Sequence, residues 1–155
     1  MKLELIALGA KPPGWVREGV DEYRRRMPRE CSLSVTELAI PKRNKNHVPE
    51  RSRIAEARKI QGATKVGAYN VALDMKGTIW STEELAERLS GWINDYQVVQ
   101  FVIGGPDGLQ DEVVATADAV WSLSRLTFPH FLVPVLIAEQ LYRAWTVING
   151  HPYHR

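Results

Sequence analysis

The sequence predicts an α/β fold, a mostly parallel sheet flanked by helices on both faces. Short stretches rich in β-branched residues alternate along the chain with longer stretches of helical periodicity. Such alternation is typical of βαβ units, in which a crossover helix returns the chain to a parallel strand. With 155 residues and no repeat, low-complexity tract or long linker, the chain is expected to form a single domain over residues 1–155.

Each element has its own signal. Alternating apolar residues predict strands at 3–8, 33–40, 69–73 and 98–103, with a short one near Val120. Helices are expected between and after the strands, at 15–26, 50–61, 82–93 and 131–148. The first follows Pro12-Pro13 and the second follows Pro49, because proline is favoured at helix starts. Ser81, with Glu84 three residues later, forms the pattern of a capping box for the third.

Composition excludes several classes of protein. Hydrophobic residues make up 45% and charged residues 25%, as in ordinary soluble globular proteins, and no apolar run reaches the roughly 20 residues of a membrane span. The N-terminal residues lack the apolar region of a signal peptide, so a cytoplasmic location away from membranes is expected. Cys31 is the only cysteine, which excludes an internal disulfide and a cysteine-based metal site. We expect no metal and interpret Cys31 as a core residue.

Basic residues are concentrated in the N-terminal part of the chain. Residues 1–60 carry 14 Lys and Arg against 8 Asp and Glu, whereas residues 61–155 carry 6 against 10. Three basic clusters at 24–29, 42–45 and 51–59 suit a polyanion such as RNA, although a solvated surface is the default explanation of any single cluster. The polar segment 42–48 is expected to be a mobile loop that orders on RNA or phosphate, or a plain solvated connection.

Three loops are expected at the carboxyl ends of predicted strands, at 73–77, 104–109 and 122–130. Ligands bind at this edge of an open parallel sheet. Gly104 and Gly105 end an apolar strand and permit close approach of a ligand or of another backbone segment. No Gly-Lys-Ser/Thr follows the glycines, and no G-x-G-x-x-G follows the first strand, so neither a Walker-type site nor a dinucleotide site is supported. The third loop would suit a flat heterocycle such as adenine.

The last five residues have the chemistry of a site. His151-Pro152-Tyr153-His154-Arg155 places two imidazoles, a phenol and a guanidinium where chains usually fray. These groups exchange protons or hold anions, and they follow an apolar helix that can anchor them.

Four segments carry a resemblance to a known family. They are VIGGPDG at 102–108, SLSRLTFPH at 122–130, EQLYRAW at 139–145 and NGHPYHR at 149–155. In them the chain resembles the SPOUT-class methyltransferases and, more narrowly, the large-subunit ribosomal RNA methyltransferase H family, which methylates N3 of a pseudouridine in an intersubunit stem-loop of 23S rRNA. The likeness extends over residues 2–155 and is most specific in the C-terminal third.

The resemblance implies a knotted fold, an assembly, a substrate and a cofactor that the pattern of the residues does not predict. It implies a deep C-terminal trefoil knot, which is rare among folds. It implies a homodimer whose active site is shared between protomers, with large-subunit ribosomal RNA in assembled ribosomes as the substrate. It also implies that S-adenosylmethionine is the methyl donor and lies in the knotted loops, against the residues Leu73, Gly105, Ser124, Arg125, Leu126, Thr127, Phe128 and Pro129.

Methyl transfer to an imide nitrogen requires in-line alignment, a dry pocket and loss of the N3 proton. The candidates for catalysis are His154, Tyr153, Arg155 and Arg143, in a favoured scheme where His154 takes the proton, Tyr153 stacks on the base and Arg155 stabilises the anion. Other assignments stay open: His151 or His130 as the base, Tyr142 for stacking, and Arg143 for the anion or a phosphate. Equally, Tyr142 and Arg143 are explained as packed helix residues, and His130 as a group that caps or orients the helix start.

Two rival functions remain at this point. A non-catalytic ribosome-binding or RNA-binding factor would use the basic N-terminal part of the chain, and a nucleotide-dependent hydrolase would use the glycine loop. Specific binding of S-adenosylmethionine separates the first rival from a methyltransferase, whereas salt-sensitive RNA binding does not. The missing Lys-Ser/Thr argues against the second.

Overall fold

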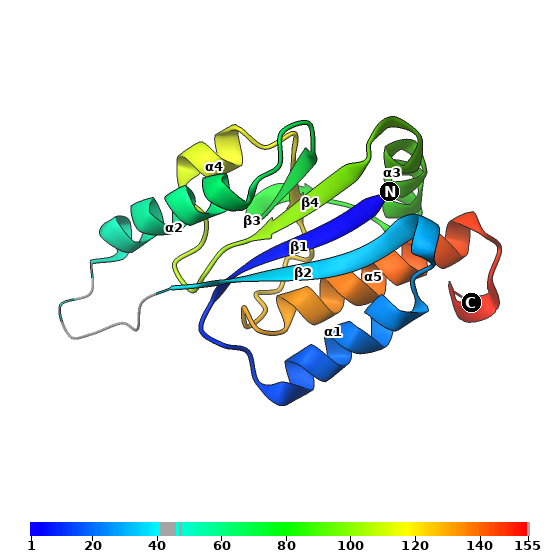
Figure 1. Ribbon diagram of the computed structural model, residues 1–155, viewed down its shortest axis with the longest axis horizontal. Helices are drawn as coiled ribbons and strands as arrows, with labels where there is room; N and C mark the ends of the chain where they lie inside the picture. The colour runs from blue at the N-terminus through cyan, green and yellow to red at the C-terminus, as the bar shows by residue number, and fades with distance from the viewer. Residues whose placement is uncertain (41–45, 47, 155) are drawn as a thin grey trace.

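The computed structural model describes residues 1–40, 46 and 48–154, except the side chain of His154. Within these residues five strands form one all-parallel sheet in the order β2-β1-β4-β3-β5 (Figure 1). The strands are β1 (Lys2–Gly9), β2 (Ser32–Ala39), β3 (Tyr69–Ile79), β4 (Val98–Ile103) and β5 (Ala119–Ser122). The predicted α/β class with a parallel sheet is confirmed.

Helices connect the strands as the sequence predicts. They are α1 (Gly14–Arg26), α2 (Pro49–Ala63), α3 (Thr82–Asp95), α4 (Asp111–Ala115) and α5 (Val133–Ile148), with short 3-10 turns η1 (Arg29–Cys31) and η2 (Pro152–His154). The predicted capping box of α3 is present: Ser81 Oγ accepts from the Glu84 amide at 3.1 Å, and Glu84 Oε2 accepts from the Ser81 amide at 2.7 Å.

Both faces of the sheet are covered, each by its own apolar core. The larger core joins α1, α3 and α5 to one face and includes the fully buried Leu5, Phe101 and Ile137. The smaller core joins α2 and α4 to the other face through Ile60 and Val113. Figure 1 shows α1 and α5 side by side below the sheet and α2 with α4 above it.

A buried polar group ties the centre of the sheet to the end of α2. Glu4 is 8% exposed, and its carboxylate accepts from Thr36 Oγ1 at 2.9 Å, from Lys65 Nζ at 2.8 Å and from Gln100 Nε2 at 2.8 Å. Burial raises the pKa of Glu4, but these three hydrogen bonds outweigh burial and the net pKa is lowered. The side chain is therefore held as a carboxylate by paired donors.

Three sequence predictions differ from the structure. The expected loop 73–77 is wrong, because β3 continues to Ile79 after a break in register against β5, where both Leu73 and Thr78 pair with Trp121. The five-residue helix α4 was not predicted, since it is too short to show a periodicity. Helix α5 begins at Val133, two residues later than expected.

Two other expectations concern the surface. The greater part of the basic segment 42–48 lies outside the described residues. Among the residues that the structure does describe, no helix has both the length and the apolar character needed to cross a bilayer.

Candidate functional site

The loop after β4 is a tight glycine turn. The amide of Gly108 donates to the carbonyl of Gly105 at 2.9 Å, and Gly108 has a φ of +76°, which only glycine adopts without strain. A Cβ on Gly104 would lie 2.8 Å from the carbonyl carbon of Gly108 and 2.9 Å from the nitrogen of Leu109. Gly104 therefore lets the turn fold back closely on the end of β4.

The loop after β5 is shaped by its own hydroxyl groups. Ser124 Oγ accepts from the amide of Leu126 at 2.9 Å, and Ser122 Oγ donates to the carbonyl of Ser124 at 3.1 Å. The apolar Leu126 is 71% exposed, which is unusual for a leucine in a structured turn. The loop therefore presents backbone groups and an apolar side chain that the rest of the chain does not cover.

The irregular stretch of β3 completes the same edge of the sheet. Asp74 Oδ1 accepts from the amide of Lys76 at 2.8 Å, within the stretch where the register of β3 against β5 breaks. A Cβ on Gly77 would lie 2.7 Å from the carbonyl group of Val120, so only glycine lets β5 pass at this distance. Met75 is 66% exposed, and its sulfur is 3.9 Å from Thr127 Oγ1 of the loop after β5.

These three segments enclose a cavity of about 580 Å³, within the range of small-molecule sites. Six of the eight residues expected to contact a cofactor line it, namely Leu73, Gly105, Ser124, Leu126, Thr127 and Phe128. The other two, Arg125 and Pro129, belong to the same loop but lie outside the lining. The lining also includes Trp121 and Val133, which place the cavity at the start of α5.

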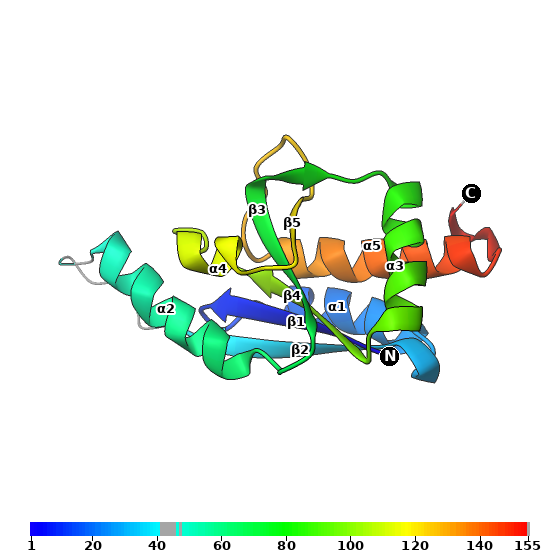
Figure 2. The same cartoon turned by 90° about the horizontal axis from the view of Figure 1, so that it is seen from above.

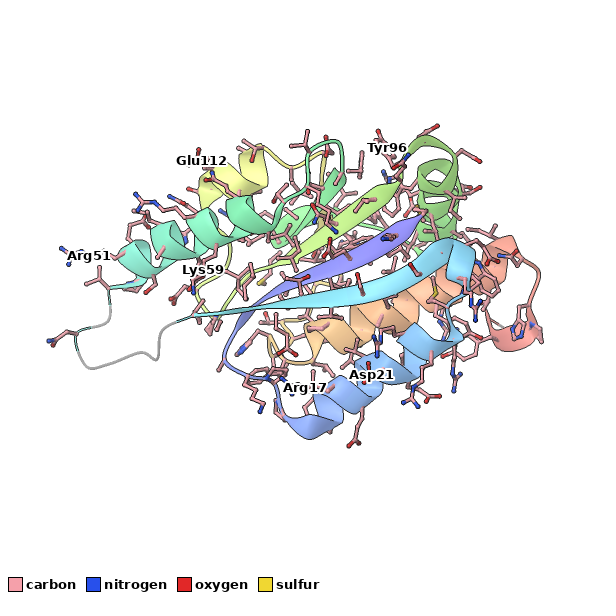
Figure 3. All side chains as sticks on the ribbon, viewed as in Figure 1. Arg17, Asp21, Arg51, Lys59, Tyr96 and Glu112 are labelled. Carbon is pink, nitrogen blue, oxygen red and sulfur yellow. The ribbon has the colours of Figure 1, made fainter. Side chains whose placement is uncertain are left out.

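A second cavity of about 460 Å³ adjoins the first. It lies between the end of β1, α1 and the start of α5, with an apolar floor and a charged rim of Lys11, Arg17, Asp21, Arg24 and Glu37. Figure 3 shows Arg17 and Asp21 on the flank of α1, and Arg17 pairs with Glu37 of β2 at 2.9 Å. His130 and Ile103 line both cavities, so His130 stands on the wall between them.

Beyond α5 the chain turns back and forms a compact cluster against this helix, the terminal cluster of Glu139, Tyr142, Arg143 and Tyr153. Gly150, with a φ of +64°, closes the helix, and the amide of His151 donates to the carbonyl of Thr146 at 2.9 Å. The turn η2 then returns Tyr153 to α5. Its ring packs edge-on against Tyr142, with centroids 4.8 Å apart.

Glu139 is the polar centre of this cluster. Its Oε1 accepts from Arg143 Nη2 at 2.6 Å and from the Tyr153 hydroxyl at 3.2 Å, and the Arg143 guanidinium lies 5.1 Å from the Tyr153 ring centre. Burial, then a hydrogen bond with Tyr23 and the charge of Glu139, raise the pKa of Tyr153 above the ordinary range of a phenol. Tyr153 is therefore neutral at physiological pH, which suits stacking or hydrogen bonding.

The cavity lies at the start of α5, and the chain passes beyond the other end of this helix before it reaches η2 (Figure 2). Glu139 and Arg143 follow Val133 by six and ten residues, which is about 9 and 15 Å along the helix at 1.5 Å per residue. Of the predicted catalytic residues, Arg143 and Tyr153 belong to the terminal cluster, and His154 follows them in η2; the side chain of His154 and all of Arg155 lie outside the described residues. The lining of the cavity includes neither Arg143 nor Tyr153 of the same chain.

The described side chains offer no cluster of three or more His, Cys, Asp or Glu that would hold a metal ion. Cys31 is buried, and burial raises the pKa of its thiol to about 11, as expected for a core residue.

Comparison with known proteins identifies the fold. The family model described as a predicted SPOUT methyltransferase matches residues 1–154. The chain belongs to the SPOUT methyltransferase family. Its similar relatives include proteins named ribosomal RNA large subunit methyltransferase H. The one from Hahella chejuensis is 48% identical over all of this chain and 99% of its own length. Those from Methylococcus capsulatus and Pseudomonas aeruginosa are 48% and 45% identical, each over the full length of both proteins.

Sequence reasoning missed several features of this SPOUT methyltransferase. The expected cofactor residues include Gly105 and not Gly104, although a side chain on Gly104 would collide with backbone and one on Gly105 would meet the side-chain ends of Glu56 and Ile40, at 3.3 and 3.4 Å. The sequence hid the difference, because the two glycines are adjacent and directly follow the same strand. Glu139 carried no signal either, since a carboxylate four residues before Arg143 is typical of any exposed helix.

Proposed function

We propose that this SPOUT methyltransferase transfers a methyl group from S-adenosylmethionine to N3 of a pseudouridine in a stem-loop of 23S ribosomal RNA. The cavity bounded by β3, the glycine turn and the loop after β5 carries the proposal. The name shared by the full-length relatives supports large-subunit ribosomal RNA as the substrate. A role on ribosomes also favours the cytoplasm.

The residues of the cavity fit an adenosyl sulfonium compound. About 580 Å³ accommodates a ligand of this size. The cradle is made of glycine backbone and of a loop with apolar Leu126 and Phe128, which suits an adenine held by main-chain groups. When bound, S-adenosylmethionine supplies the methyl group on its sulfonium. The family's trefoil knot is part of the proposal, supported by the meeting of the segments 73–76, 103–108 and 121–128 in one cavity.

We further infer that two protomers make each active site. The terminal cluster does not line the cavity of its own chain, whereas a two-fold partner with its α5 reversed would bring its own cluster to that cavity. Half-buried apolar residues at the start of α5 and just before it are available for such an interface, namely Phe131, Leu132 and Leu136. Phe131 and Pro134 also line the cavity next to α1, which the partner would cover.

In this scheme the tail of the partner handles the target base. Tyr153, neutral and held by Glu139, stacks on or hydrogen-bonds to the pseudouridine. His154 accepts the N3 proton, and Arg155 stabilises the imide anion as it forms, with Arg143 completing the positive surface. His130, which lines the cavity of the first protomer, is the alternative base.

A methylation assay tests the proposal. Unaltered protein is incubated with labelled S-adenosylmethionine and with intact ribosomes, free 23S rRNA or rRNA lacking pseudouridine. Product is expected only where the pseudouridine is present, and nuclease mapping should place the methyl group on its N3. Single-turnover rates for His154→Ala and His130→Ala then assign the base; full activity of the first variant removes His154 from that role. Binding of ribosomes without methyl transfer favours a non-catalytic factor.

Mixing two inactive variants tests the shared site. One variant carries a defect in the cavity, Gly105→Val, and the other lacks residues 151–155. A mixed dimer contains one intact composite site, so about half of the unaltered activity is expected in each mixed dimer. No recovery after mixing and refolding indicates that each protomer works alone.

A further inference from the structure

Helix α2 lies against the outer side of the glycine turn, although about fifty residues separate them in the sequence. Arg53 of α2 donates from Nη2 to the carbonyl of Leu109 at 2.8 Å. Its side chain is 24% exposed, and its other contacts are with Glu50 at 3.4 Å and Asp111 at 3.3 Å. The carbonyl is thus held by a guanidinium rather than by water alone.

The bond acts on the residue that closes the turn. Leu109 directly follows Gly108, and its nitrogen lies where a side chain on Gly104 would collide. The Leu109 side chain is 5% exposed in the smaller core with Ala57 and Ile60 of α2. Both its backbone and its side chain are therefore fixed by α2.

A second side chain of α2 lies on the same face, one helical turn later. Glu56 is 4% exposed, and a Cβ on Gly105 would lie 3.3 Å from its Oε2. Residues three apart lie on one side of a helix, so Arg53 and Glu56 together form a wall behind the turn. The cavity lies on the inner side of the same turn, where Gly105 and Gly108 line it.

We propose that Arg53 is a positioning residue for the cofactor site. It acts through the Leu109 carbonyl, which fixes the closing end of the glycine turn in the shape that binds S-adenosylmethionine. The inference rests on the proposed function for the identity of the ligand. The ion pairs of Arg53 with Glu50 and Asp111 are exposed, at 62% and 100% of those carboxylate side chains, and such pairs contribute little.

Three variants separate this role from charge and from general stability. Arg53→Met keeps the length of the side chain without the donor, Arg53→Lys restores one donor, and Arg58→Met removes an exposed charge of the same helix. Calorimetric titration with S-adenosylmethionine should show about tenfold weaker binding for Arg53→Met, partial recovery for Arg53→Lys and a change within twofold for Arg58→Met. In turnover, KM for S-adenosylmethionine should rise in the same order while kcat at saturation is kept.

Amide hydrogen exchange at residues 104–109 tests, without any ligand, whether Arg53 holds the glycine turn in place. Faster exchange is expected in Arg53→Met and not in Arg58→Met. Unchanged exchange and unchanged affinity in Arg53→Met overturn the inference, as does an equal loss in Arg58→Met. A lowered Tm with unchanged affinity also overturns it, since that result describes a purely structural residue. If the unaltered protein does not bind S-adenosylmethionine, the proposed function fails together with the ligand assigned here, while exchange still decides whether Arg53 holds the turn.

Discussion

Replacing Gly104 by alanine adds one methyl group where the glycine turn packs closely against the end of β4. The new Cβ would lie 2.8 Å from the carbonyl carbon of Gly108, 2.9 Å from the nitrogen of Leu109 and 3.1 Å from the Leu109 Cγ. Two of these atoms are backbone, so the strain is relieved only if the glycine turn moves away from β4. The same movement deforms the cavity wall, because Gly105 and Gly108 belong to the turn.

The size of the effect follows from the cost of overpacking. An extra methyl group in a closely packed site costs about 1–3 kcal/mol of unfolding free energy. For a chain of this length, about 2 kcal/mol corresponds to a Tm lowered by roughly 4–8 °C. Affinity for S-adenosylmethionine should fall at least about tenfold, because binding then needs the turn to return to its original place.

Two matched glycines serve as controls for this variant. Gly105→Ala meets only the ends of two side chains at 3.3 and 3.4 Å, so we expect a Tm within about 2 °C of the unaltered protein. Gly91→Ala lies in α3 with nothing within 4 Å, and it should gain about 0.5–1 kcal/mol from helix propensity. Scanning calorimetry and titration with S-adenosylmethionine measure both quantities. A Gly104→Ala protein that melts and binds like the unaltered one would refute the steric reasoning.

Three further predictions concern the polar groups. Glu139→Gln should slow single-turnover methylation by about tenfold or more, because it weakens the hydrogen bond that holds Tyr153. The affinity for S-adenosylmethionine in calorimetry should be unchanged, because Glu139 does not line the cavity. Equal methylation rates would show that Glu139 does not have this role. The lowered pKa of Glu4 means that its stabilising contribution is present above about pH 4.5 and is lost as the pH falls through the lower folded value. Urea unfolding of Glu4→Gln and the unaltered protein should therefore converge towards pH 3, and a constant gap would contradict the sign. Cys31, with its pKa raised to about 11, should react with a disulfide reagent at pH 8 only after unfolding.

The sequence predicted the strands and long helices because their burial follows a regular period. It failed at β3, where Asp74, Lys76 and Gly77 are residues that usually mark a turn. The strand continues there because glycine permits the backbone of β5 to pass close by, a reason that lies in another part of the chain. Local propensity cannot contain such information, since the approaching backbone at Val120 is more than forty residues away.

The candidate site could likewise be predicted from the sequence only in part. The three strand-end segments that line the cavity could be predicted, because parallel strands bring their carboxyl ends to one edge. The wall behind the glycine turn could not, because it depends on where the turns of α2 fall against Leu109. Nor could the sequence tell that six expected cofactor residues line the cavity while Arg125 and Pro129 of the same loop do not.

The place of the terminal cluster follows from helix geometry rather than from the residues of the tail. The start of α5 contributes Val133 to the cavity, and Tyr153 is bound to Glu139, six residues further along the helix, so α5 sets a fixed separation between the cavity and the tail within one chain. Shortening the tail cannot close that separation, and Glu139 holds Tyr153 back against α5 rather than leaving it free to reach across. A tail that is held rigidly in this way is suited to contact the surface of a second molecule. In a symmetric dimer the same rigidity acts twice, since each chain offers a preformed cavity at one end of α5 and a preformed tail at the other.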